Sequence, residues 1–236
     1  MEIKGINHLE KKKNKAIFLG CGSSIKHITK DQYESIKKEY DIWVSNGFFM
    51  HDFIQPDFYH LEVNLNNFGE LFNLYFRDAI PKIKNSEFIF SKQYLHYLNY
   101  IDMSFKETIY AYNSYQSIAS ETGYDNHPFF VRDSGCNLSK IVDIMIKMKY
   151  QEISFAGVDL SNSLYFWTDK ENIPAIINFS KPDENTRYSM HHSFSNTIKF
   201  LKGISKFEKN RISFYNLSKD SLLNDILEYK EIFWKF

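Results

Sequence analysis

Short runs of apolar, aromatic and β-branched residues alternate with segments of helical spacing, and this alternation restricts the fold more than any other feature. The runs are Ala16–Cys21, Asp41–Ser45, Phe58–Val63, Glu87–Ser91, Phe129–Arg132, Ile153–Gly157 and Arg211–Tyr215. Residues 138–148, between two of these runs, repeat apolar side chains at the spacing of one helix face. Parallel strands need crossover connections, which helices commonly supply. We therefore expect an α/β fold with a mostly parallel sheet and helices on both faces.

The whole chain, 1–236, reads as a single domain. Hydrophobic residues make up 43% of it, enough for a packed core, and no repeat or Gly/Ser/Pro-rich linker divides it. Residues 161–193 differ, because they are rich in Asn, Asp and Ser and contain Pro174 and Pro182. Long segments of this kind are often functional, and we expect a lid over the sheet.

Charge and cysteine content exclude several classes of protein. Lys plus Arg and Asp plus Glu both number 29, so nothing favours nucleic acid as a partner. Cys21 and Cys136 are the only cysteines, which predicts neither a disulfide framework nor a zinc cluster. Because the sequence shows neither an apolar leader nor an apolar segment long enough to span a membrane, we expect a cytoplasmic protein. Residues 227–236 mix aromatics with charge and predict a terminal helix that docks on the body; contact with a membrane surface is the alternative.

The segment Gly20-Cys-Gly-Ser-Ser24 follows the first long apolar run. Glycines here allow close approach of a ligand, and a following helix would offer unpaired N–H groups to a phosphate. A dinucleotide enzyme, an S-adenosylmethionine methyltransferase and another nucleotide user all fit, as does a turn with no ligand. The first two normally place an acid at the end of the second strand, where this chain has Asn46.

Three further places carry polar groups at expected strand ends or in loops. Asn46 and Asn64 end two strands, where an amide can both donate and accept, although Asn is also a common turn residue. Ser134-Gly135 forms a second strand-to-helix turn that can point N–H groups at the same crevice. Capping of the helix by Asp133 or Ser134 is the simpler account, and the two are compatible. The pair His191-His192 precedes another helix, and we weigh a general base against a surface pair. No further ligand at metal spacing supports a zinc site there.

Taken in order, these motifs resemble the bacterial sialyltransferases of glycosyltransferase family 42. The resemblance runs from the strand before Gly20 to Leu223 and rests on order and spacing. Its motifs are Gly20-x-Gly22-x-Ser24, Ser45-Asn46-Gly-Phe48, Asn64, Ser134-Gly135, the run from Tyr150 to Asp159, the Tyr/His-Ser stretch, and Phe214–Leu217 with Ser221–Asn224.

The resemblance implies a Rossmann-like nucleotide-binding fold of a GT-A-like kind and an inverting transfer from CMP-sialic acid without an obligatory metal ion or other cofactor. Asn46, Asn64, Ser134 and Gly135 would hold the cytidine and ribose, and Gly20–Ser24 would lie against the CMP. In the lid, Tyr165 would hydrogen-bond the departing phosphate and Tyr188 would lie near the reacting centre. The base would be His192 when the chain is aligned from Ser193 and His191 when it is aligned from Tyr188; the downstream helix favours His192.

Three positions depart from that family, and they bear on the sugar. Cys21 stands where the family has Asn, and Ser161 where it has a second Tyr; Arg132 is offset by one residue. A donor carrying Kdo or another nonulosonic acid is therefore an alternative to sialic acid. We expect a glycosyltransferase acting on a glycan or glycolipid of a bacterial surface, such as lipooligosaccharide or capsule, with self-association left open. A nucleotide-binding protein without activity and a methyltransferase are the rivals.

Overall fold

The structure is a computed structural model that describes residues 1–62, 69–99, 101–116, 129–160, 165–166 and 194–231. Its strands are β1 (Glu2–Gly5), β2 (Lys15–Leu19), β3 (Tyr40–Ser45), β4 (Phe58–Leu61), β5 (Glu87–Ser91), β6 (Thr108–Gln116), β7 (Phe130–Asp133), β8 (Glu152–Ala156), β9 (Ser213–Asn216) and β10 (Glu228–Tyr229). Its α-helices are α1 (Lys30–Glu39), α2 (Gly69–Ile83), α3 (Asn137–Lys147) and α4 (Phe194–Glu208). Short 3₁₀ helices cover Ile6–His8, Ser23–His27, Asn46–Met50, Lys92–Asn99 and Leu222–Asp225.

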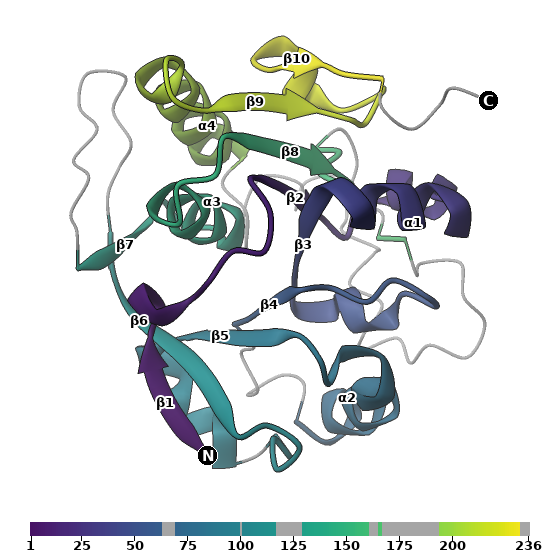
Figure 1. The fold of residues 1–236 in the computed structure, drawn as a ribbon, viewed down its shortest axis with the longest axis vertical. Coiled ribbons are helices and arrows are strands. Elements are labelled where there is room, and N and C mark those ends of the chain that lie inside the picture. The colour runs from purple at the N-terminus through teal and green to yellow at the C-terminus, as the bar shows by residue number, and fades with distance from the viewer. Residues whose placement is uncertain (63–68, 100, 117–128, 161–164, 167–193, 232–236) are drawn as a thin grey trace.

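The strands form one open sheet in the order β1-β6-β5-β4-β3-β2-β8-β9-β10, with β7 paired to β6 (Figure 1). Every pairing between these strands is parallel. The expected mostly parallel α/β sheet is therefore confirmed. Each of the seven predicted apolar runs contains most of a strand.

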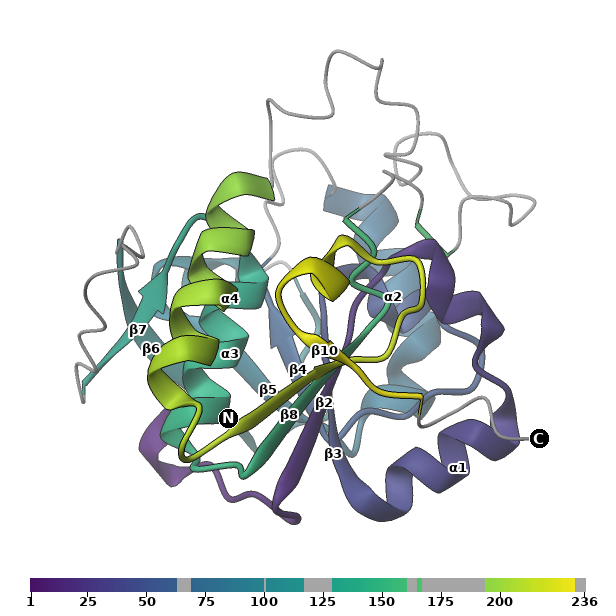
Figure 2. The same cartoon turned by 90° about the horizontal axis from the view of Figure 1, so that it is seen from above.

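Helices cover both faces of the sheet, with α3 and α4 on one side and α1 and α2 on the other (Figure 2). Successive strand residues point to opposite faces, so both faces of a central strand must be apolar. In β2, Ile17 and Leu19 pack into the core on the α1 side, whereas Ala16 and Phe18 pack into the core against α3 and α4. This two-sided burial explains why the strands read as continuous apolar runs in the sequence.

The chain order reverses next to β2. From β2 the chain adds β3, β4, β5 and β6 on one side, and it returns to place β8 on the other. The last residue of β2, Leu19, pairs with Val44 of β3 and with Ala156 of β8. Such a reversal leaves a crevice beyond the carboxyl ends of the two diverging strands, where open α/β sheets bind their ligands. The segment Gly20–Ser24 and the segment after β8 both begin at this point.

At the end of the chain, the structure differs from the sequence-based prediction. Residues 227–231 do not form a helix; Glu228 and Tyr229 pair with β9 instead. The backbone N–H of Lys230 donates to the carbonyl of Asn216, and its ammonium group lies 3.1 Å from a Glu152 carboxylate oxygen. The strands β1 and β6 were likewise not expected. Both lie toward one edge of the sheet, where residues are less uniformly apolar.

Candidate active site at the carboxyl edge of the sheet

The glycines of the first turn are needed because another chain segment crosses it. A Cβ atom at Gly22 would lie 2.6 Å from the carbonyl oxygen of Gly157 and 2.6 Å from a carboxylate oxygen of Asp159. A Cβ atom at Gly20 would overlap the same Gly157 carbonyl. Gly157 itself has a φ of +69°, which favours glycine. The turn after β2 and the turn after β8 are therefore packed backbone against backbone.

Three of the N–H groups of the first turn, those of Gly20, Gly22 and Ser24, are used inside the protein. Gly20 N–H donates to Ala156 O at 2.7 Å, and Gly22 N–H to Gly157 O at 2.8 Å. The N–H of Ser24 donates to Asp159 Oδ2 at 2.9 Å, and the Ser24 hydroxyl donates to Asp159 Oδ1. The prediction that the helix after the turn offers unpaired N–H groups is therefore wrong for Ser24. Asp159 occupies the place at which an anion would bind.

The helix expected directly after the turn is also different. Ser23–His27 is a 3₁₀ helix of five residues, and the α-helix α1 begins only at Lys30. A Thr29–Gln32 capping box explains this start: Gln32 N–H donates to Thr29 Oγ1, and Thr29 N–H donates to Gln32 Oε1. The dipole of α1 consequently starts several residues beyond the turn, which removes the second reason to expect a phosphate there.

Cys21 and Tyr165 pack together at this turn. Gly22 and Tyr165 form an antiparallel bridge, and Phe166 N–H donates to Cys21 O at 3.0 Å. The Cys21 thiol lies 3.8 Å from the Ser45 carbonyl oxygen. Burial raises the pKa of Cys21 to about 12, and burial also raises the pKa of Tyr165 to about 12. Both side chains therefore stay neutral, and the Cys21 thiol is a packing group rather than a nucleophile.

Asn46 is held in a strained conformation at the end of β3. Its φ is +46°, which is uncommon for a residue with a side chain and is tolerated best by Asn and Asp. The Tyr59 hydroxyl donates to its carbonyl oxygen, and Glu62 N–H donates to its Oδ1 at 2.9 Å. The amide oxygen thus has one partner inside the protein, and the amide nitrogen is a group that can donate to a ligand. Asn46 can therefore act at this edge as a hydrogen-bond donor.

The Ser134-Gly135 turn is open, in contrast to the first turn. Gly135 has a φ of +88°, yet a Cβ atom built there would meet none of the described residues within 4 Å. The Ser134 hydroxyl oxygen is buried and has no partner in the part of the chain that the structure describes. Buried polar atoms nearly always find a partner, so an unpaired one at a strand end indicates a place for a ligand or water.

The predicted capping of α3 by Asp133 or Ser134 is wrong. The residue at the N-cap is Cys136, and its side chain makes no capping hydrogen bond. Instead, Asp133 Oδ1 accepts from Gly135 N–H at 2.8 Å, and Ser139 Oγ accepts from Ser134 N–H at 3.0 Å. Asp133 therefore shapes the turn before the helix, which leaves the Ser134 hydroxyl uncommitted.

Several predicted site residues lie outside the described residues. These are Asn64, Tyr188, His191 and His192, together with Ser161 and nearly all of the expected lid at 161–193. Their assignments stay predictions. Of the expected lid, residues 165 and 166 are described, and both contact the Gly20–Ser24 turn.

Sequence reasoning missed Asp159, Glu62 and Lys140 as parts of this edge. Asp159 follows the apolar run of β8 by three residues, so its position at a strand end was a usable signal. Lys140 is different: it falls on a helix whose other residues are mostly apolar, and it is buried against Glu62, 78 positions away. Such a long-range ion pair leaves no local pattern.

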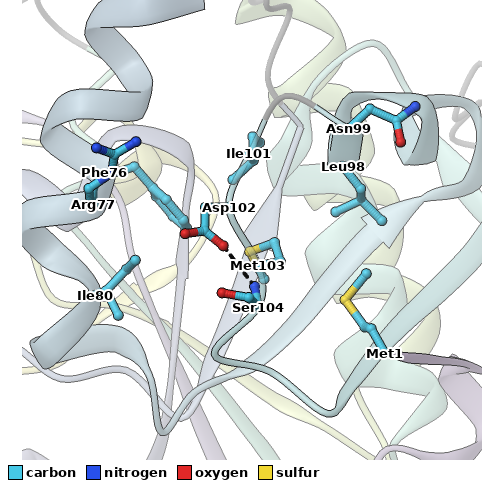
Figure 3. Close-up of a pocket in the computed structure, with 10 residues that line it drawn as sticks. All are labelled: Met1, Phe76, Arg77, Ile80, Leu98, Asn99, Ile101, Asp102, Met103 and Ser104. Carbon is cyan, nitrogen blue, oxygen red and sulfur yellow. Dashed lines mark hydrogen bonds between the residues drawn. The ribbon is translucent and has the colours of Figure 1, made fainter.

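A cavity of about 480 Å³ lies elsewhere, between α2 and residues 98, 99 and 101–104 (Figure 3). Phe76, Arg77 and Ile80 line it from α2, and Met1 lines it from the start of the chain. Met1 and residues 101–104 precede β1 and β6, so the cavity lies toward the amino ends of those strands. It shares no residue with the two turns.

No group of three or more His, Cys, Asp or Glu side chains among the described residues is placed to hold a metal ion. None of the helices that the structure describes is long and apolar enough to cross a membrane.

Comparison with known proteins gives matches only at the level of structure. No protein-family model and no curated protein sequence matches this chain. The sialyltransferase CstII of Campylobacter jejuni, solved in complex with the substrate analogue CMP-3FNeuAc, aligns over 94% of this chain and 89% of its own, with a TM-score of 0.60 and 18% identity. The monofunctional α-2,3-sialyltransferase Cst-I of the same organism aligns over 97% and 84%, with a TM-score of 0.57 and 16% identity. The chain thus has the fold of these two sialyltransferase structures along nearly its whole length.

Proposed function

We propose that this protein is an inverting glycosyltransferase that moves sialic acid, or a related 2-keto acid sugar, from a CMP donor to a hydroxyl of a bacterial surface glycan. The observation that carries the proposal is the fold similarity over 94% of the chain to a sialyltransferase solved with a CMP-sugar analogue. This fold similarity agrees with the resemblance that the ordered sequence motifs indicate. The proposal includes work in the cytoplasm on a glycan or glycolipid acceptor such as lipooligosaccharide or capsule, with peripheral contact at the inner membrane.

The described polar groups suit a neutral nucleoside. Asn46 offers an N–H₂ donor to an acceptor atom of cytosine or ribose, and the Ser134 hydroxyl has no hydrogen-bond partner among the described residues. The N–H groups of Gly20, Gly22 and Ser24 already donate to residues 156, 157 and 159, so in this proposal the Gly20–Ser24 turn contributes mainly its shape. In this proposal Asn64 and Gly135 also contact the donor, and Tyr165 lies close to its phosphate.

The chemistry needs few catalytic groups, because CMP is already a good leaving group. The acceptor hydroxyl oxygen attacks the anomeric carbon, the bond from that carbon to the phosphate oxygen breaks, and a base takes the hydroxyl proton. We assign the base to His192, with His191 as the alternative, and place Tyr188 near the reacting carbon. Alignment, hydrogen bonds to the departing phosphate and one base are sufficient for such a transfer.

The test measures CMP released from CMP-Neu5Ac and from CMP-Kdo by the purified protein, since slow hydrolysis needs no acceptor. Faster release from one donor identifies the sugar. We expect His192→Ala to lower the rate by about 100-fold or more, the usual contribution of a general base, and to leave the Kd for CMP unchanged. His8→Ala, an exposed histidine on the first 3₁₀ helix, is the control and should keep the full rate.

Two results would count against the proposal. Normal turnover in both His192→Ala and His191→Ala would contradict the assigned mechanism. Absence of CMP binding, combined with tight binding of S-adenosylmethionine in calorimetry, would replace the transferase by a methyltransferase.

A further inference from the structure

A buried ion cluster lies at the same edge of the sheet as the two polar groups of the proposed donor site. The ammonium group of Lys140 lies 2.5 and 2.6 Å from the two carboxylate oxygens of Glu62 and 3.1 Å from Asp133 Oδ2. The side chains of Lys140, Glu62 and Asp133 are 4%, 11% and 16% exposed. Lys140 comes from the second turn of α3, Glu62 follows β4, and Asp133 ends β7.

The cluster has a role other than contact with a ligand. The ammonium group donates hydrogen bonds to both carboxylate oxygens of Glu62 and forms an ion pair with Asp133. A charge this deeply buried is stable only while it is paired, so Lys140 holds the two carboxylates where they are. The cation therefore joins two chain segments that are distant in the sequence.

Each of the two carboxylate residues holds one part of the proposed donor site. The backbone N–H of Glu62 donates to Asn46 Oδ1 at 2.9 Å and so holds the orientation of the Asn46 amide. Asp133, through its other oxygen, accepts from Gly135 N–H at 2.8 Å and fixes the turn that carries the buried Ser134 hydroxyl. One ammonium group thus lies midway along a chain of contacts from Asn46 to Gly135.

We propose that Lys140 is a positioning residue for the donor pocket: through Glu62 and Asp133 it sets the spacing between the Asn46 amide and the Ser134-Gly135 turn. The inference rests on the proposed function, because it takes the cytidine part of the donor as the group that spans these two elements. Loss of Lys140 then weakens binding of the nucleoside even though its side chain does not reach it.

A purely electrostatic role predicts something different. Without Lys140, two carboxylates would be left unpaired near an anionic donor, and the repulsion would act on the phosphate of CMP. Cytidine carries no charge, so repulsion would leave its affinity unchanged. Altered positioning would weaken CMP and cytidine by the same factor. The two ligands together separate the two explanations.

The experiment is calorimetry with CMP and with cytidine on the wild-type chain, Lys140→Met, Lys140→Arg and Lys147→Met. Lys147 is the matched control, because it lies at the other end of α3 and makes its own ion pair with Asp143 at 2.7 Å. We expect Lys140→Met to weaken both ligands by tenfold or more, Lys140→Arg to recover part of the loss, and Lys147→Met to stay within twofold of the wild type. Thermal unfolding of each variant shows whether it is folded.

Each outcome of this experiment supports or overturns the positioning role of Lys140. Folded Lys140→Met with wild-type affinity for both ligands, or with a loss for CMP only, overturns the positioning role and leaves the proposed function standing. A wild-type chain that binds neither CMP nor cytidine overturns both. If Lys140→Met does not fold, Glu62→Gln takes its place, since it keeps the backbone N–H on Asn46 and removes only the charge that Lys140 holds. A threefold or larger loss for both ligands then supports the role, and unchanged affinities overturn it.

Discussion

The two glycine-containing turns at the carboxyl edge of the sheet resemble each other in sequence and differ in how they are held. After β2, a Cβ atom at Gly20 would overlap the carbonyl of Gly157, and the N–H groups of Gly20, Gly22 and Ser24 donate to residues 156, 157 and 159. After β7, a Cβ atom at Gly135 would meet nothing, and the Ser134 hydroxyl has no partner among the described residues. The first turn is closed by the protein, and the second is open.

The difference shows that a glycine after a strand has more than one physical cause. In the closed turn, glycine is required for space between two backbones; in the open turn, it is required for a positive φ. Polar groups that the protein leaves unpaired are the ones that a ligand can use. The open turn and Asn46 are therefore better candidates for contacts with a ligand than the Gly20-Cys-Gly22 segment.

Gly20→Ala should have the largest effect on stability. We expect a loss of about 3 kcal/mol or more, because neither backbone at the crossing can move without breaking hydrogen bonds. Gly135→Ala is the paired variant and should cost only about 1 kcal/mol, the penalty of a positive φ with a Cβ atom present. Urea unfolding of both measures the difference. Equal losses would remove the distinction between a closed and an open turn.

Asp159→Asn tests what closes the first turn. The carboxylate accepts hydrogen bonds from Ser23 and Ser24, and bonds to a charged acceptor contribute about 2 kcal/mol of stability. We expect a loss of that size in the free energy of unfolding. Asp220→Asn, at an exposed position, should change stability by less than about 0.5 kcal/mol. A loss no larger than that of the control would mean that the glycine crossing alone holds the turn.

His60, which lies near the open turn, should make the protein sensitive to acid. Burial, with a smaller contribution from Lys140, lowers its pKa from 6.5 to about 3. The unfolded chain then binds a proton below pH 6.5 and the folded chain does not, so stability is complete above pH 6.5 and falls as the pH drops toward 3. The slope is about 1.4 kcal/mol per pH unit.

The variant His60→Gln should remove that slope while leaving a partner for the Tyr112 hydroxyl, which lies 2.7 Å from His60 Nε2. The free energy of unfolding measured at pH 7, 6 and 5 gives the comparison. The same steep fall in both proteins would assign the acid sensitivity to other groups.

The smallest expected effect concerns Cys21, for which we predict slow alkylation of the thiol and no change in stability. A thiol with a pKa of about 12 is ionised about a thousandfold less at pH 8 than an ordinary cysteine, so iodoacetamide should react correspondingly slowly. Mass spectrometry of a Cys136→Ala variant follows this single thiol, and labelling in denaturant is the reference. Fast labelling of the folded protein would indicate that the first turn opens in solution.

Local patterns predicted most of the sheet. Each expected run contains a strand, because a strand between two helical layers must be apolar on both faces. The strands that were missed lie near the edges: the burial of β1 and β6 is incomplete, and β10 has only two residues. The predicted terminal helix was wrong for residues 227–231, since pairing with β9 is a long-range contact that the mixture of aromatic and charged residues does not reveal.

The sequence by itself determined the α/β class, the alternation of strands and helices, and the positions of both glycine turns, because these follow from the periodicity and from residues with special backbone freedom. Only the tertiary structure decided which turn is closed. That depends on Asp159 meeting Ser24 across 135 positions and on Lys140 meeting Glu62 across 78. Whether an N–H, a hydroxyl or a charge is left for a ligand depends on its partners in space, and those partners come from distant parts of the chain.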